Sequence, residues 1–265
     1  MRLKDKTAIV IGAGQGPGTG MGNGRATVLR FAQEGAKVMA VDRDLASAQE
    51  TVSKAGKGTD CFAFEADVTK EATLKAAIAA AKARWGRIDI LHYNVGVSIA
   101  GGDAPVTEIT EEAFDRITAI NLRGAVMACK HVIPIMREQH TGCILMISSL
   151  AAVEKYPLVT YKATKAAMIA FTEQMAIQNA EYGVRANVIL PGLMDTPMAV
   201  DTRARATGKS RAEVAAMRDA RVPLRHKMGT AWDVANAALF LASDEAGFIT
   251  GVSLLVDGGG ALNTG

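Results

Sequence analysis

The chain has 265 residues, 49% of them hydrophobic, so it is long enough to bury a sizeable core as a single α/β domain spanning residues 1–265. Its 30 basic and 27 acidic residues give a formal net charge of only +3, which disfavours a nucleic-acid-binding surface and favours a small-molecule ligand. The amino-terminal sequence lacks the features of a signal peptide, and no segment reaches membrane-spanning length, so we expect a cytoplasmic protein.

Short β-rich runs alternate with longer alanine-rich stretches of helical period. This order predicts a doubly wound α/β fold, in which a seven-stranded parallel sheet has helices on both faces. The expected strands are 7–11, 37–41, 60–65, 88–93, 142–148, 184–190 and 253–256. Right-handed crossovers then place a ligand crevice at the carboxyl ends of the strands.

The expected helices are 25–33, 45–54, 71–85, 111–138, 159–181 and 231–243. Pro134 should kink or end the fourth helix, because proline lacks the N–H group that the helix needs. The segment from about 198 to 228 is rich in alanine and arginine and has little β character. We interpret it as a helical excursion that covers the substrate.

The first strand runs into a loop with glycine at every even position from Gly12 to Gly24, and a helix follows. Glycines let the backbone turn tightly and approach a pyrophosphate, whose charge the N-terminus of the helix attracts. A flexible surface loop is the alternative interpretation. The order of strand, glycine loop and helix therefore predicts a dinucleotide site that needs further support.

The second strand ends in Val41-Asp42-Arg43-Asp44. A carboxylate at this place can accept hydrogen bonds from the adenosine ribose and would repel a 2′-phosphate, so Asp42 favours NAD over NADP. Arg43 could instead neutralise a 2′-phosphate. A plain turn residue is the structural alternative for Asp42.

Tyr161 and Lys165 are four residues apart on a predicted helix and so share one of its faces. A nearby ammonium group favours the phenolate, which brings the pKa of tyrosine toward a useful range for proton transfer. Twelve residues before Tyr161, the fifth strand ends in Ser148-Ser149, which places a hydroxyl at the carboxyl edge of the sheet.

This combination of a glycine-rich first turn, a hydroxyl at a strand end and a Tyr-x-x-x-Lys helix resembles the short-chain dehydrogenase/reductase family. The resemblance runs the full length of the chain and implies a Rossmann fold. Further segments similar to family motifs are Asp67-Val68, Asn94-Val95-Gly96, Asn121, residues 191–198 and residues 251–259.

The resemblance implies that Tyr161 is the general acid/base, that Ser149 orients the substrate oxygen, and that Lys165 lowers the pKa of Tyr161 and binds the nicotinamide ribose. Asn121 would support a proton-relay water. The implied cofactor-binding residues are Gly12, Gly22, Gly24, Asp42, Asp67, Val68, Asn94, Gly96, Tyr161, Lys165, Pro191, Gly192 and Thr196. The candidate substrate contacts are Ser149, Ala151, Tyr156, Met194 and Met198. No metal is required.

The sequence departs from the family pattern in four places, one of which is Ile11 in place of the threonine often found before the first glycine. The glycine motif holds six more residues than the usual spacing allows, and we expect the added segment to bulge into solvent, although it could wrap round the pyrophosphate or reach the substrate. Tyr93 stands where the family often has the first of two asparagines. The spacing from Ser149 to Tyr161 is one residue shorter than in many relatives, which makes Ser148 the runner-up for the hydroxyl role.

The leading functional hypothesis is an NAD-dependent oxidoreductase that transfers hydride between nicotinamide and a secondary alcohol or ketone. The apolar candidate pocket wall suits a hydrophobic substrate, whereas nearby Glu154, Lys155, Arg203 and Arg205 suit a sugar or an acid. The alternatives are a 3-oxoacyl thioester reductase, which Asp42 disfavours because such enzymes usually use NADPH, and a non-catalytic dinucleotide-binding sensor. The resemblance also implies a homotetramer.

Overall fold

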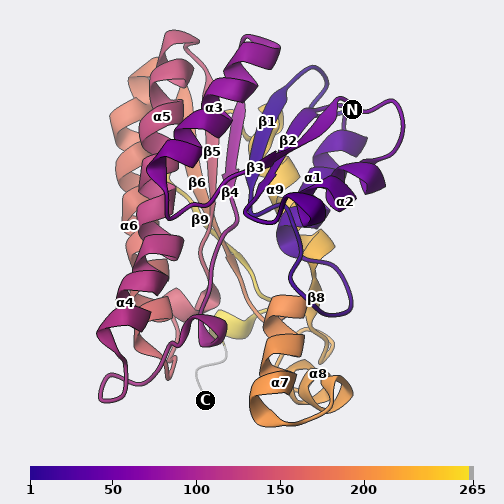
Figure 1. Cartoon of the computed structure of the whole chain (residues 1–265), viewed down its shortest axis with the longest axis vertical. Helices are drawn as coiled ribbons and strands as arrows, with labels where there is room; N and C mark the ends of the chain where they lie inside the picture. Colours follow the sequence, from indigo (N-terminus) through magenta and orange to yellow (C-terminus); the bar gives the residue numbers. More distant parts are fainter. Residues whose placement is uncertain (263–265) are drawn as a thin grey trace.

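A computed structural model of the protein describes residues 1–262. Seven parallel strands form its main sheet, in the order β3-β2-β1-β4-β5-β6-β9 (Figure 1). These strands are β1 (Thr7–Ile11), β2 (Lys37–Asp42), β3 (Cys61–Glu65), β4 (Ile90–Tyr93), β5 (Gly142–Ile147), β6 (Val184–Pro191) and β9 (Ser253–Val256). The predicted doubly wound fold with a seven-stranded parallel sheet is thus confirmed. Two short strands, β7 (Met194–Asp195) and β8 (Gly229–Thr230), pair separately.

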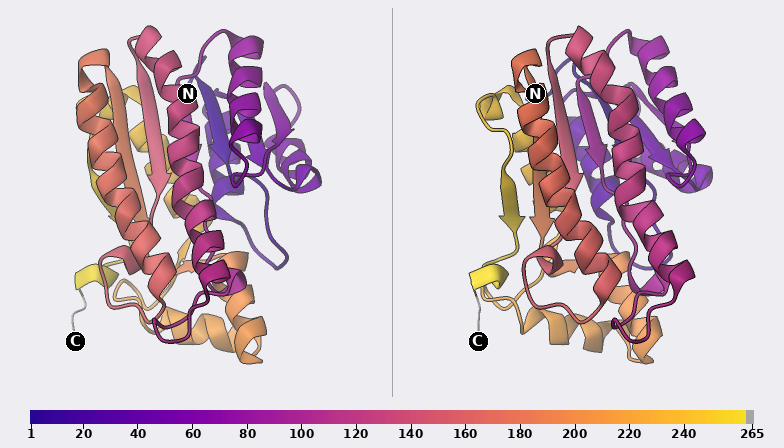
Figure 2. Two further views of the ribbon diagram at one scale, coloured as in Figure 1. Left: turned by 60° about the vertical axis from the view of Figure 1, so that its left-hand side comes forward. Right: turned by 90° about the vertical axis from the view of Figure 1, so that its left-hand side faces the viewer.

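Helices cover both faces of the sheet (Figure 1). One face carries α1 (Asn23–Gln33), α2 (Leu45–Ala55) and α9 (Ala231–Ala242). The other carries α3 (Glu71–Trp85), α5 (Gly124–Glu138) and α6 (Val159–Asn179). The helices α4 (Glu111–Thr118), α7 (Thr202–Thr207) and α8 (Arg211–Asp219) lie toward the end of the molecule to which the strand arrowheads point (Figure 2). Within residues 1–262, no helix is long and apolar enough to cross a membrane.

The two-sided covering explains the composition of the strands. All five residues of β1 are buried, with Ile9 and Ile11 in the core beneath α3, α5 and α6, and Ala8 and Val10 in the core beneath α1 and α9. Strands buried on both faces read as continuous apolar runs rather than as alternating ones. Each fully buried aliphatic side chain contributes about 1.5–3 kcal/mol, so the sheet provides a rigid frame for the residues at its carboxyl edge.

The fourth expected helix, 111–138, is divided in the structure. The helix α4 ends at Thr118, a π-helical segment covers Ala119–Arg123, and α5 then continues through Pro134 to Glu138, so Pro134 does not end the helix. The carbonyl of Ile120 in the π-helical segment accepts a hydrogen bond of 2.6 Å from the hydroxyl of Tyr93. A buried partner on β4 thereby stabilises a break in the helical hydrogen bonding that helical periodicity does not reveal.

His92 lies in β4 with an exposed fraction of 0%. Its ring packs edge-on against Phe31, with 6.3 Å between the ring centroids, and neither ring nitrogen has a hydrogen-bond partner within the described part of the chain. Burial lowers the pKa of His92 to about 3, against an ordinary value of 6.5. This histidine is therefore a neutral core residue whose polar atoms reduce stability.

We expect His92→Leu to raise the free energy of unfolding by about 1–2 kcal/mol near neutral pH, because it removes unpaired buried polar atoms. The difference in free energy of unfolding between His92→Leu and the wild type should be larger at acidic pH. The unfolded wild-type chain binds a proton at His92 near pH 6.5 and the folded chain does not, so wild-type stability falls as the pH drops from 6.5 toward 3. Urea unfolding of both proteins at pH values of about 5 and 8 tests this, and a smaller gain at the acidic pH would contradict it.

Candidate active site

The first turn of α6, which carries Tyr161, is fixed by a carboxylate from a distant loop. Leu158, the N-cap residue, provides no side-chain hydrogen bond. Instead, the Asp103 carboxylate accepts hydrogen bonds from the backbone N–H groups of Thr160 (2.9 Å) and Tyr161 (3.1 Å). The Ser98 hydroxyl donates to the same carboxylate at 3.0 Å, and Asp103 is 9% exposed. Asp103 is therefore a positioning residue for Tyr161, and it is not among the residues predicted from the sequence.

Of the two serines at the end of β5, Ser149 lies beside Tyr161. It follows the end of β5, its Oγ accepts a hydrogen bond of 3.2 Å from the backbone N–H of Ala151, and its side chain is close enough to the Tyr161 hydroxyl to lower the pKa of that group. The buried Ser148 instead donates to the backbone carbonyl of Lys165 at 2.7 Å. The geometry thus gives Ser148 a packing role between β5 and α6 and leaves the Ser149 hydroxyl beside the phenol.

Lys165 lies one turn after Tyr161, with its Nζ 5.8 Å from the centroid of the tyrosine ring. The ammonium donates to the carbonyls of Ile147 (2.7 Å) and Val95 (3.4 Å), and the residue is 2% exposed. Burial lowers the pKa of Lys165 to about 7. The lysine is thus held at the ends of β4 and β5, where a small change in surroundings alters its charge.

Burial raises the pKa of Tyr161 to about 12, while the hydrogen bond with Ser149 and the positive charge of Arg203 act in the opposite direction. Lys165, which the sequence predicts to lower this pKa, is itself buried, and desolvation of the phenol dominates.

Asn121 lies in the π-helical segment with an exposed fraction of 0%. Its amide oxygen accepts from the backbone N–H of Val97 (2.8 Å), and its amide nitrogen donates to the carbonyl of Val97 (3.0 Å) and to the hydroxyl of Thr164 (3.1 Å). Asn121 therefore fastens the loop after β4 to α6. Its role in supporting a proton-relay water stays a prediction.

The glycine loop brings the start of α1 close to the end of β1. Gly12 has a φ of +84°, and its carbonyl accepts a hydrogen bond of 3.0 Å from the Asn94 side chain. A Cβ atom on Gly24 would clash with that carbonyl and would lie 2.7 Å from the Asn94 amide nitrogen. No side chain caps the N-terminus of α1, at Gly22, so its first N–H groups are suited to an anionic ligand.

Asp42 ends β2 beside this loop. Its carboxylate accepts from the backbone N–H groups of Gly14 (2.8 Å) and Asp44 (3.1 Å), so it stabilises the turn. An ionised carboxylate has about four acceptor positions, which leaves capacity for a ribose. The charge of the neighbouring Arg43 helps to lower the pKa of Asp67, whose carboxylate binds Thr69. Both charges thus lie at the edge where an adenosine would be bound.

The other predicted cofactor residues follow the ends of β3, β4 and β6. A Cβ atom on Gly96 would lie 3.0 Å from the Lys165 ammonium, and one on Gly192 would lie 2.7 Å from Asp257. Thr196 is 6% exposed, and its hydroxyl accepts from the backbone of Ala199 at 3.3 Å. The two remaining residues are Val68, which is buried, and Pro191, which ends β6.

Two of the predicted substrate contacts lie next to Tyr161 or Ser149, and the other two belong to the segment after β6. The Tyr156 ring lies 5.7 Å from the Tyr161 ring, and Ala151 is buried next to Ser149. The sulfur of Met194 lies where it would meet a Cβ atom on Gly229, in the neighbouring strand β8, and Met198 is 47% exposed.

The six-residue insertion is exposed but does more than bulge into solvent. The Gln15 side chain closes the loop by bonding to the backbone of Gly20 and Gly22. The backbone N–H of Thr19 donates to the Asp201 carboxylate at 3.3 Å, and Arg211 donates to the Thr19 carbonyl at 3.5 Å. Figure 1 shows the indigo loop reaching toward α7 and α8. We call residues 197–228, which include these helices, the arginine-rich lobe.

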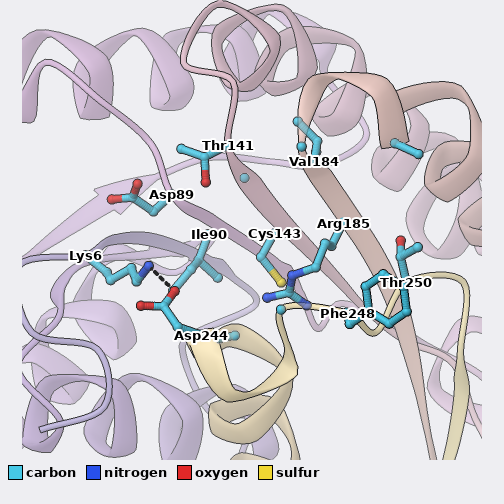
Figure 3. Close-up of a pocket in the computed structure, with 15 residues that line it drawn as sticks. Lys6, Asp89, Ile90, Thr141, Cys143, Val184, Arg185, Asp244, Phe248 and Thr250 are labelled. Carbon is cyan, nitrogen blue, oxygen red and sulfur yellow. Dashed lines mark hydrogen bonds and ion pairs between the residues drawn. The ribbon is translucent and has the colours of Figure 1, made fainter.

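A cavity of about 450 Å³ lies at the opposite end of the sheet (Figure 3). It is lined by the first residues of three strands, Ile90, Gly142 and Val184, and by the ion pair between Lys6 and Asp244, with 2.6 Å between the charged atoms. None of the predicted site residues lines it. Because ligands of open parallel sheets bind at the carboxyl ends of the strands, this cavity is not the candidate active site.

Comparisons with known proteins agree with the fold. A sequence profile of the family described as enoyl-(acyl carrier protein) reductase matches residues 18–261. The chain is 34% identical to 2-(R)-hydroxypropyl-CoM dehydrogenase from Xanthobacter autotrophicus, over 96% of this chain and 97% of the relative. It is also 34% identical to a 3-oxoacyl-[acyl-carrier-protein] reductase from Thermotoga maritima, over 98% of this chain and 99% of the relative.

Solved structures show the same similarity. A Burkholderia xenovorans protein described as a short-chain dehydrogenase/reductase superposes with a TM-score of 0.89 at 40% identity, covering 100% of this chain and 99% of that one. Levodione reductase superposes with a TM-score of 0.90 at 29% identity, covering 99% and 100%. The chain belongs to the short-chain dehydrogenase/reductase family. It is an oxidoreductase of that family, whose members bind nicotinamide dinucleotide cofactors.

The contact between the inserted loop and the lobe can be tested through Asp201. Its carboxylate binds Arg211 (3.3 Å) as well as Thr19, while Arg211 also binds Asp195 at 2.5 Å. We expect Asp201→Asn to loosen the lobe and to speed tryptic cleavage after Lys209 by about 3- to 10-fold, because local opening then costs less free energy. Asp244→Asn, which removes a distant surface ion pair, is the control. Equal cleavage rates in all three proteins would contradict a fastening role.

Proposed function

We propose that this chain transfers hydride between NAD and a secondary alcohol or its ketone, with Tyr161 as the general acid/base. The convergence of Tyr161, Ser149 and Lys165 at the carboxyl end of β5 is the observation that carries the proposal. A hydroxyl donor, a buried phenol and a lysine in one place can hold a substrate oxygen and move one proton. A dinucleotide-binding sensor would not need this set.

The residues present fit a nicotinamide dinucleotide. Gly12 and Gly24 allow α1 to approach the end of β1 closely, and the uncapped N-terminus of α1 suits a pyrophosphate. Asp42 would accept hydrogen bonds from the adenosine ribose, which supports NAD over NADP. Lys165, beside Gly96, would bind the nicotinamide ribose.

The bound nicotinamide would supply or take up the hydride. The chain itself handles the proton. In reduction the Tyr161 hydroxyl would donate a proton to the carbonyl oxygen, and in oxidation the phenolate would accept the proton of the substrate hydroxyl. Ser149 would hold the same oxygen by a hydrogen bond. The positive charge of Arg203 favours the phenolate against the opposing effect of burial.

Replacing Tyr161 with phenylalanine should lower kcat by at least about 100-fold and leave the affinity for NAD nearly unchanged, because only the proton-transfer group is lost. The measurement is reduced-nicotinamide absorbance with a panel of secondary alcohols, cyclic diols and sugars, together with their ketones for the reverse reaction. Tyr182→Phe is a matched control, since Tyr182 packs under Arg137 away from Tyr161. A Tyr161→Phe protein with wild-type kcat would overturn the proposal.

We expect Asp42→Ala to lower the affinity for NAD by about 10- to 100-fold and to lower that for NADP much less, because ribose hydrogen bonds are lost while repulsion of a 2′-phosphate disappears. Fluorescence titration with the two reduced cofactors measures both constants. Asp44→Ala, which removes a carboxylate at the N-cap of the next helix, is the control. An unchanged ratio of the two affinities in Asp42→Ala would show that Asp42 acts only in the turn.

A thioester substrate is the second candidate. One relative is named as a 3-oxoacyl-[acyl-carrier-protein] reductase and is as similar to this chain as the hydroxypropyl-CoM dehydrogenase is. Asp42 argues against a thioester substrate, because it favours NAD and 3-oxoacyl thioester reductases usually use NADPH. Adding an acetoacetyl thioester to the substrate panel with both reduced cofactors separates the two functions.

The proposal includes a homotetramer. The edge strand β9 exposes Leu255, which is 42% exposed, and the outer surface of α6 exposes Ile177, which is 72% exposed. Apolar side chains at a sheet edge and on a long helix support burial of these surfaces against further copies of the chain.

A further inference from the structure

The arginine-rich lobe concentrates positive charge at one end of the molecule. Residues 197–228 contain eight arginine and lysine residues and three acidic residues, so the lobe has a net charge of +5 and the rest of the chain one of −2. The lobe lies beyond the carboxyl ends of the strands (Figure 2), on the side of Tyr161 and Ser149. A charge asymmetry of this kind points to an anionic partner.

Arg218 is the least exposed charged residue of the lobe, at 7%. Its Nε lies 3.3 Å from the sulfur of Met228, and its Nη2 lies 3.5 Å from the carbonyl of Met194. Neither group carries a charge that could balance a guanidinium. Two carboxylates interact with the charge of Arg218 from a distance, and each has another partner: Asp195 pairs with Arg211, and Asp219 pairs with Lys227. Within residues 1–262, Arg218 has no ion-pair partner, which is costly for a buried charge.

Arg203 faces the same space from α7. Its Nη1 donates to the carbonyl of Ala199 at 2.9 Å, and no carboxylate in the described residues pairs with it. The charge of Arg203 lowers the pKa of Tyr161 and repels the charge of Arg218. Arg218 also interacts electrostatically with Tyr156. Burial together with this repulsion lowers the pKa of Arg218 to about 10. The charges of the two guanidinium groups therefore act on the two tyrosines at the candidate site.

We propose that Arg203 and Arg218 bind an anionic group of the substrate, a carboxylate or a similar oxyanion, a few bonds away from the carbon that exchanges hydride. The inference deepens the proposed function and rests on it. Guanidinium groups match the planar geometry of a carboxylate, and an anion between them would relieve both their repulsion and the unpaired burial of Arg218. The substrate class is thus a hydroxy acid or keto acid rather than a neutral alcohol.

The test compares an acid with its uncharged ester. Acetoacetate and methyl acetoacetate share a reacting ketone and differ in charge. Calorimetric titration of the NAD-bound protein, in which the oxidised cofactor has no hydride to give to the ketone, should show binding of acetoacetate about 10- to 100-fold tighter than that of the ester, as expected for a charge-assisted hydrogen-bonded pair. Arg218→Met and Arg203→Met should each remove most of that preference and change binding of the ester little.

Two controls make the outcome decisive. Lys209→Gln removes one positive charge from an exposed position of the same lobe and should keep the preference for acetoacetate. Arg218→Lys preserves the charge and should keep part of that preference, which guards against a folding defect in Arg218→Met. Equal binding of acid and ester to the wild-type protein, or an undiminished preference in both methionine variants, would overturn the proposal.

The binding readout separates this inference from the proposed function. Tyr161→Phe should bind acetoacetate like the wild type while losing turnover. If turnover of neutral alcohols with NAD is found and acetoacetate binds no better than its ester, the anion site fails and the oxidoreductase function stands. If acetoacetate binds through Arg218 and no substrate is turned over, the anion site stands and the proposed function fails.

Discussion

The position of Tyr161 depends on the hydrogen bonds between the Asp103 carboxylate and the first turn of α6. That helix carries both Tyr161 and Lys165, so its starting point decides whether the phenol meets Ser149 at the end of β5. A carboxylate at a helix N-terminus also interacts favourably with the helix dipole. Asp103 itself is held by Ser98, which joins the loop after β4 to the helix in one buried network.

The parts of the fold that are determined by local sequence could be predicted. Apolar runs such as residues 7–11 form strands because both of their faces are covered, and the Tyr161–Lys165 spacing places both residues on one helix face. The bond from Asp103 could not be predicted, since it joins residues 58 positions apart and has no spacing signature. The raised pKa of Tyr161 likewise arises from burial in the folded chain.

Tyr93 shows how one departure from the family pattern is accommodated. Its hydroxyl bonds to the carbonyl of Ile120, and a Cβ atom on Gly124 would clash with that hydroxyl. The large side chain in β4 and the glycine at the start of α5 therefore fit one another around the π-helical segment. That segment in turn holds Asn121, whose amide fixes Val97 and Thr164. A residue in the core thus affects the geometry of the site through the helix it packs against.

The contact between the inserted glycine loop and the arginine-rich lobe has a kinetic consequence. Thr19 belongs to the loop that would enclose the dinucleotide, and Asp201 and Arg211 belong to the lobe. A cofactor held beneath both can leave only after the lobe has moved away from the loop. Release of a dinucleotide bound there would then be coupled to movement of the lobe.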